Sequence, residues 1–75
     1  MIRAGVYRHF KGNLYVVLGT VRHSETEEEL VLYRSQGSDQ LWVRPLAMWE
    51  EFVDRDGYRG PRFLFVGGEQ KQGGL

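Results

Sequence analysis

Three adjacent residues, His23, Ser24 and Glu25, carry the side chains of acid–base and nucleophilic chemistry. Histidine is the usual general base near neutral pH, but it must reach a nucleophile and be oriented by a partner such as Glu25. Neighbouring side chains on an extended strand point to opposite faces, so His23 and Ser24 form a dyad only if the chain turns between them. A histidine that completes a turn is therefore favoured over a small hydrolase or isomerase centred on His23 and Glu25.

The acidic stretch after His23 has the oxygen ligands that divalent cations prefer, at Glu25, Glu27, Glu28 and Glu29. Loops that wrap a cation usually space their ligands with asparagine, aspartate and glycine, and this spacing is missing. Because the chain has no cysteine and only two histidines, a zinc ribbon is also excluded. We expect no metal and no cofactor, and we interpret the stretch as a solvated turn.

Aromatic and arginine side chains form a stronger candidate, for a binding surface. Tyrosine and tryptophan offer large rigid contact areas, and arginine offers planar donors for carboxylates, phosphates and base edges. In a strand over residues 41–44, Trp42 and Arg44 share one face. If Leu41 and Val43 fill the core, that face is outside; alternatively Trp42 packs beneath a helical turn and Arg44 stacks on it. The candidate ligand-binding residues are Tyr7, His9, His23, Glu25, Tyr33, Arg34, Trp42, Arg44 and Arg62.

Size and charge limit the classes of function. A chain of 75 residues forms one domain with a small core. Ten basic and ten acidic residues give no net charge, which disfavours a dedicated nucleic-acid binder but leaves room for a local basic patch. No apolar run approaches the roughly 18 residues of a membrane span, and the first residues lack the apolar segment of a signal peptide. We therefore expect a cytoplasmic protein with no membrane partner.

The first half of the chain contains three strand-like runs, at residues 5–10, 14–23 and 30–33. The Lys11-Gly12-Asn13 link between the first two runs is typical of a hairpin. Both faces of the second run are apolar, which predicts a central strand that is covered on two sides or curved around a barrel interior. Gly19 favours a bulge or bend within it.

The second half mixes strand and helix signals. A turn-rich segment precedes the strand over residues 41–44, which Pro45 ends because proline has no amide proton to donate. The apolar spacing over residues 46–53 predicts one or two helical turns with proline at the entry. In this helix Trp49 and Phe52 would belong to the core.

Gly57 is expected to end the helix, with an irregular segment over residues 58–61 and a last strand over residues 62–66. The glycine-rich residues 67–75 are expected to be a disordered tail. The sequence thus predicts an all-β domain over residues 1–66. It would be a small, strongly bent antiparallel SH3-like barrel of about five strands, with one short helical turn before the last strand. An OB-type barrel is the alternative.

Six separated blocks together carry a family resemblance. They are Gly5–Gly12, Tyr15–Gly19, His23–Thr26, Leu30–Arg34, Trp42–Pro45 and Pro61–Phe63. With these blocks the chain resembles, over roughly residues 5–65, a bacterial family of small proteins catalogued as a domain of unknown function, number sixteen fifty-three. The resemblance implies an SH3-like barrel of this size and implies no activity.

These observations favour a non-enzymatic binding module. The aromatic and arginine surface would hold a peptide, a nucleotide-like molecule or another small anionic aromatic partner, with nucleic acid as a disfavoured subcase. The alternative is a structural or homo-oligomeric interaction protein, in which the same surface forms a homodimer interface. A small enzyme using His23 and Glu25 is the third possibility.

Overall fold

The computed structural model describes residues 2–68, and this part of the chain is mainly β-structure. It contains seven strands and one short helix, which confirms the predicted all-β class. Of the predicted disordered tail, residues 69–75 lie outside the described residues. No helix within residues 2–68 is long and apolar enough to cross a membrane. The elements are β1 (Gly5–His9), β2 (Leu14–Arg22), β3 (Glu29–Ser35), β4 (Trp42–Pro45), α1 (Leu46–Trp49), β5 (Phe52–Arg55), β6 (Tyr58–Pro61) and β7 (Phe63–Gly67).

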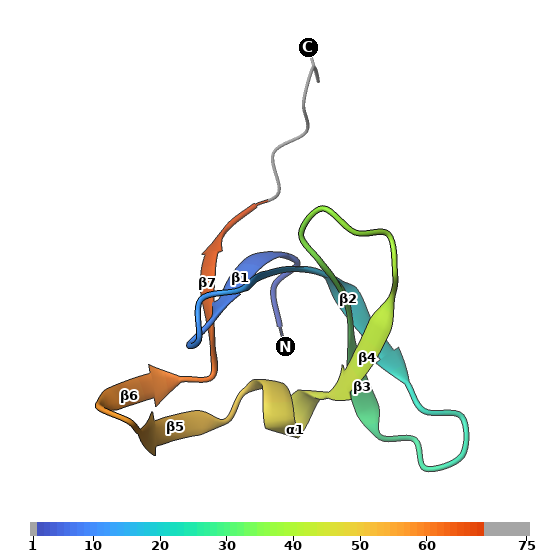
Figure 1. The fold of residues 1–75 in the computed structure, drawn as a ribbon. Coiled ribbons are helices and arrows are strands. Elements are labelled where there is room, and N and C mark those ends of the chain that lie inside the picture. The colour runs from blue at the N-terminus through green and yellow to red at the C-terminus, as the bar shows by residue number, and fades with distance from the viewer. Residues whose placement is uncertain (1, 69–75) are drawn as a thin grey trace.

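Five strands form one antiparallel sheet in the order β4-β3-β2-β1-β7, and β5 and β6 form a separate hairpin. The sheet arches over α1 (Figure 1), but its edge strands β4 and β7 do not pair with each other. The predicted SH3-like barrel is therefore not confirmed, because the sheet does not close. β5 and β6 pair with each other, and α1 lies beneath the arch.

The strand signals of the first half are confirmed. The β1–β2 hairpin turns at Gly12, whose backbone φ is +112° and whose N–H donates to the carbonyl of His9 at 2.7 Å. This left-handed conformation favours glycine. The pairing of β2 with β3 shifts register between Val17 and Gly19, which confirms the predicted bulge. β2 is central, between β1 and β3.

The core lies on the face of the sheet that is turned toward α1, which we call the inner face. Its aromatic centre is the stacked pair of Trp49 and Phe63, with ring centroids 3.7 Å apart and planes 5° from parallel. The predicted core position of Trp49 is confirmed, since only 2% of the residue is exposed. Burial raises the pKa of Tyr7, whose hydroxyl donates to the Arg3 carbonyl at 2.8 Å. The buried cluster is Tyr7, Val17, Val31, Tyr33, Trp49 and Phe63.

Of the two alternatives for β4, the structure contradicts the one in which Leu41 and Val43 fill the core. Both residues are about half exposed, at 48% and 52%. Directly paired residues of an antiparallel sheet share a face, and Trp42 pairs with the core residue Tyr33. Trp42 and Arg44 therefore lie on the inner face. Because β4 is an edge strand, Trp42 nevertheless stays 55% exposed.

The predicted helix is shorter than expected, because it ends after Trp49. The Glu51 carbonyl accepts the N–H of Arg62 at 2.8 Å, and the chain continues as β5. In that strand Phe52 is 64% exposed, so its predicted core position is wrong. Asp56 and Gly57 both have positive φ, 54° and 80°, which suits a two-residue hairpin turn rather than a helix end. Residues 58–61, predicted to be irregular, form β6.

Candidate functional site

Four cations and four aromatic rings meet where the end of β1 approaches the β5–β6 hairpin. The contributing segments are distant in sequence: the β1–β2 hairpin, β4, the β5–β6 hairpin and the start of β7. We call this group the cationic-aromatic cluster. Its members are His9, Phe10, Lys11, Arg44, Arg55, Tyr58, Arg62 and Phe63.

The rings form a continuous row. The His9 ring lies 4.9 Å from Phe63 in an edge-on arrangement and 4.6 Å from Phe10 in a tilted one. Phe10 in turn stacks on Tyr58, with centroids 5.4 Å apart and planes at 22°. Phe63 anchors the row because it is buried in the core, whereas the other three residues are partly exposed. The row therefore runs from the core to the solvent.

The cations lie against the rings of this row. Arg55, Lys11 and Arg62 place their charged groups 5.4, 5.9 and 6.0 Å from the Phe10 ring centroid. The Arg44 guanidinium lies 5.6 Å from the centroid of Phe63. These distances are in the range of cation–π attraction. The aromatic faces thus hold several like charges close together.

Among residues 2–68, one carboxylate forms an ion pair with a cation of the cluster. Glu51 Oε1 accepts from Arg62 Nη2 at 2.7 Å, and the Arg62 side chain is 22% exposed. The Nε of Arg62 is buried, and within the described part of the chain it has no hydrogen-bond partner. The pair leaves the other cations of the cluster to be balanced mainly by the solvent or by a ligand.

The pKa of His9 reflects the positive charges that surround it in the cluster. Burial lowers the pKa of His9 below its usual value, and the positive charges of Arg62, Arg44, Lys11 and Arg55 lower it further. The His9 Nδ1 accepts the backbone N–H of Lys11 at 3.1 Å. The imidazole is thus held in an orientation that suits its neutral form, in a region of positive potential.

The structure brings together three of the candidate residues from the sequence: His9, Arg44 and Arg62. The others lie elsewhere. Tyr7 and Tyr33 are buried in the core. The register places Arg34 opposite Val16, on the face away from the core, where its Nη1 donates to the Ser38 carbonyl at 3.4 Å. Trp42 remains on the inner face at the edge of the sheet.

The histidine of the β2–β3 turn, His23, has a structural role. Its Nδ1 accepts the N–H groups of Glu25 and Thr26, at 3.0 and 3.3 Å. Every residue from His23 to Glu29 is exposed, so the predicted solvated turn is confirmed. Within residues 2–68 no group of three or more histidine, cysteine or acidic side chains is placed to hold a metal ion.

Sequence reasoning missed five members of the cluster, and one local signal was available for two of them. Asp-Gly between two β-prone runs is a strong hairpin signal, and the hairpin at Asp56-Gly57 brings in Arg55 and Tyr58. No local pattern points to the remaining three, because their partners are distant in sequence. The missed members are Phe10, Lys11, Arg55, Tyr58 and Phe63.

Comparisons with known proteins place this fold. The family described as "Protein of unknown function (DUF1653)" matches residues 5–65. The chain belongs to this family. A crystal structure of a DUF1653 protein from Bordetella bronchiseptica is 38% identical, covers 95% of each chain and superposes with a TM-score of 0.82. A comparison with curated proteins finds no match. Family membership therefore supports the fold, and the function has to be argued from the site.

Proposed function

We propose that this member of the DUF1653 family is a non-enzymatic binding module. Its ligand is a small anion with a flat aromatic ring, of the nucleotide-like class, held at the cationic-aromatic cluster. The observation that carries the proposal is the convergence of four cations on one row of rings. Glu51 pairs with only one of these cations.

The chemistry of the cluster matches the two parts of such a ligand. Arginine presents planar donors that suit phosphate and carboxylate oxygens, and lysine adds a compact charge. Phe10 and Tyr58 are partly exposed and already stacked, so they provide a flat apolar surface for a ring. A ligand anion would also relieve the repulsion among the cations. The zero net charge of the chain does not oppose this, because the charge that matters is local.

A titration followed by amide NMR tests the proposal, with AMP, inorganic phosphate and adenosine as separate probes. AMP should shift the amides of His9, Phe10 and Tyr58, and it should bind more tightly than either half alone, because it uses the rings and the cations together. If AMP and phosphate both leave these amides unmoved at millimolar concentration, the proposal is wrong.

Two arginines of the β5–β6 hairpin provide a matched pair of variants. Arg55→Gln removes a cation from the cluster and should weaken AMP binding by about 5-fold, in line with about 1 kcal/mol for an exposed ion pair. Arg59→Gln is the control, since Arg59 instead lies 3.4 Å from Asp54, with a side chain that is 75% exposed. Equal losses in both variants would point to general charge attraction and against a defined site.

A further inference from the structure

The face of the five-stranded sheet away from the core is almost entirely aliphatic. The strand register defines its members, because residues paired across neighbouring strands share a face. Eight of the ten side chains in these rows, glycine and proline aside, are valine or leucine, and the other two are arginine. We call them the outer apolar face. They are Val6, Arg8, Leu14, Val16, Val21, Leu30, Leu32, Arg34, Val43 and Leu64.

Nothing within residues 2–68 covers this face as α1 covers the inner one. Val6 and Val16, in the middle of the face, are buried among their neighbours at 7% and 2% exposure, whereas Leu14, Val21, Val43 and Leu64 around them are between 36% and 52% exposed. An antiparallel sheet with one solvated face normally alternates apolar and polar residues, whereas a sheet that is apolar on both faces is covered on both. The apolar pattern on both sides of β2 therefore calls for a second covering layer. Exposed aliphatic side chains gathered on one face of a sheet are typical of an interaction surface.

We propose that a second copy of this chain covers the outer apolar face, so that two sheets pack face to face as a two-fold symmetric dimer. Charge complementarity supports this occupant. The exposed β2–β3 turn carries Glu25, Glu27 and Glu28, and Glu29 follows as the first residue of β3, so that four glutamates lie at one end of these strands. The only charges in the rows of the face are Arg8 and Arg34, toward the other end of the same hairpins.

A two-fold axis that lies between the sheets and across the strands reverses the strand direction from one copy to the other. The acidic turn of each copy then lies near Arg8 and Arg34 of its partner. Because this contact is isologous, each favourable interaction occurs twice in the dimer. The outer face is the convex side of the arch (Figure 1), so the two sheets meet over a limited area in which their aliphatic side chains interdigitate. The proposal is independent of the ligand site, which lies at the inner side of the sheet and the β5–β6 hairpin.

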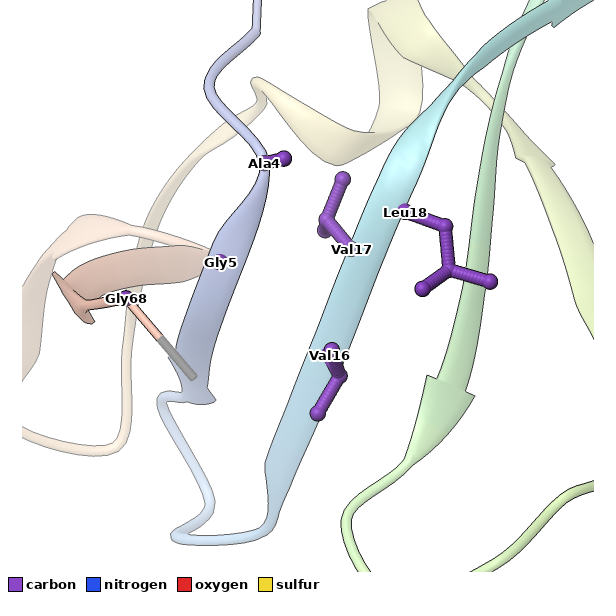
Figure 2. Close-up of a pocket in the computed structure, with 6 residues that line it drawn as sticks. All are labelled: Ala4, Gly5, Val16, Val17, Leu18 and Gly68. Atoms are coloured by element: carbon purple, nitrogen blue, oxygen red, sulfur yellow. The ribbon is translucent and has the colours of Figure 1, made fainter. Parts of the chain in front are cut away.

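A hollow beside the face provides a place for a partner side chain. Figure 2 shows it between the start of β1 and the middle of β2, where Val16, Val17 and Leu18 lie along the strand. Its volume is about 250 Å³, and its lining is Ala4, Gly5, Val16, Val17, Leu18 and Gly68. Because this lining has no charged side chain, the hollow suits an aliphatic side chain of the second copy.

The size of the face sets the expected strength of the dimer. Five strands at about 4.8 Å spacing and about five residues of strand give a footprint of about 24 by 17 Å, or about 400 Å². A standard interface buries about 800 Å² of accessible surface on each partner. The dimer should therefore be weak, and sedimentation equilibrium should be measured from about 1 μM to about 1 mM. A chain that remains monomeric throughout this range overturns the proposal.

Leu64→Glu is the decisive variant, and Phe52→Glu is its control on the β5–β6 hairpin, where Phe52 is 64% exposed. Symmetry buries two carboxylates in each Leu64→Glu dimer, and each lies opposite Arg8 of its own chain, so the dissociation constant should rise by about 10-fold or more. Phe52→Glu should leave it unchanged. Equal effects of the two variants would contradict the proposal. If circular dichroism shows that Leu64→Glu has lost its fold, Val43→Glu takes its place.

Isotope-filtered NMR on a mixture of labelled and unlabelled wild-type chain tests the same interface without any substitution. Intermolecular contacts should join the methyl groups of Leu14, Val43 and Leu64 to those of the partner. Arg8→Gln should weaken the dimer, and dimer formation should become less sensitive to salt, because one complementary charge is lost. Contacts that arise instead from Trp42 or from the β5–β6 hairpin would show a different dimer and refute this one.

Discussion

Replacing Trp49 tests how far the stability of the domain depends on one aromatic stack. The Trp49 ring stacks on Phe63, and its centroid also lies 5.0 Å from that of Tyr33 and 5.6 Å from that of Tyr7. Tryptophan-to-alanine changes in cores cost about 3–5 kcal/mol, and each aromatic pair adds about 0.5–1.5 kcal/mol beyond its buried area. We therefore expect Trp49→Ala to cost about 5 kcal/mol. A domain of this size has about 4–11 kcal/mol in total, so much of the chain should be unfolded.

Trp49→Phe separates packing from hydrogen bonding. The indole Nε1 is buried and has no hydrogen-bond partner among the described residues, and an unsatisfied buried donor costs about 1–3 kcal/mol. Phenylalanine keeps a ring next to Phe63 and removes the donor, so the relief should offset most of the lost contact area. We expect Trp49→Phe to lie within about 1 kcal/mol of the parent chain.

Urea denaturation followed by circular dichroism measures both variants by linear extrapolation. Trp49→Ala losing less than about 1 kcal/mol would show that the stack is not the centre of the core. If Trp49→Phe lowers the free energy of unfolding as much as Trp49→Ala does, the argument from the unpaired donor is refuted, because the indole N–H would then form a stabilising hydrogen bond.

Three further predictions concern single positions. Gly5→Ala should cost about 3 kcal/mol or more in urea denaturation, because a Cβ there would lie 2.6 Å from the carbonyl oxygen of Gly67 at a φ of +138°. Gly12→Ala, with φ at +112° but open space around it, should cost only about 1–2 kcal/mol, and equal costs would refute the steric argument. Glu51→Gln should tighten AMP binding by about 2- to 5-fold in calorimetry, because it releases Arg62 from its carboxylate; weaker binding would show that the pair organises the site. The folded pKa of His9 lies below its unfolded value of about 6.5, so the contribution of this residue to stability is present above that pH and is lost as pH falls from there through the folded pKa. His9→Gln should lack this loss. AMP should raise the pKa of His9 in an NMR titration.

The features that local chemistry controls were predictable from the sequence. The glycine-containing hairpin at residues 11–13, the bulge at Gly19 and the buried position of Trp49 each depend on a conformational preference or on apolar spacing within a few residues. The β5–β6 hairpin was not recognised, because the apolar spacing over residues 46–53 also suits a helix. What decides between the two is pairing across Asp56-Gly57, and pairing energy is shared with a strand that the helical pattern does not include.

The candidate site was only partly predictable, because it is assembled by contacts between distant segments. The residue that assembles it is Arg62. Its carbonyl accepts the N–H of Phe10 at 3.0 Å, and its own N–H donates to the Glu51 carbonyl at 2.8 Å. These two bonds join the end of β1 to the start of β5, and they bring Phe10 next to Tyr58. The backbone of Arg62 thus positions the rings, while its side chain contributes charge.

This division of roles separates two variants of the same residue. Arg62→Met keeps both backbone bonds and removes the charge, so the ring row should persist while AMP binding weakens. Arg62→Pro also removes the N–H that bonds to Glu51, so the β5–β6 hairpin should detach from β1. Ring-current shifts of Phe10 and Tyr58 in the proton spectrum distinguish the two results. If Arg62→Met disrupts the ring row as much as Arg62→Pro does, the side chain rather than the backbone holds the site together, and its pairing with Glu51 becomes the main structural contact.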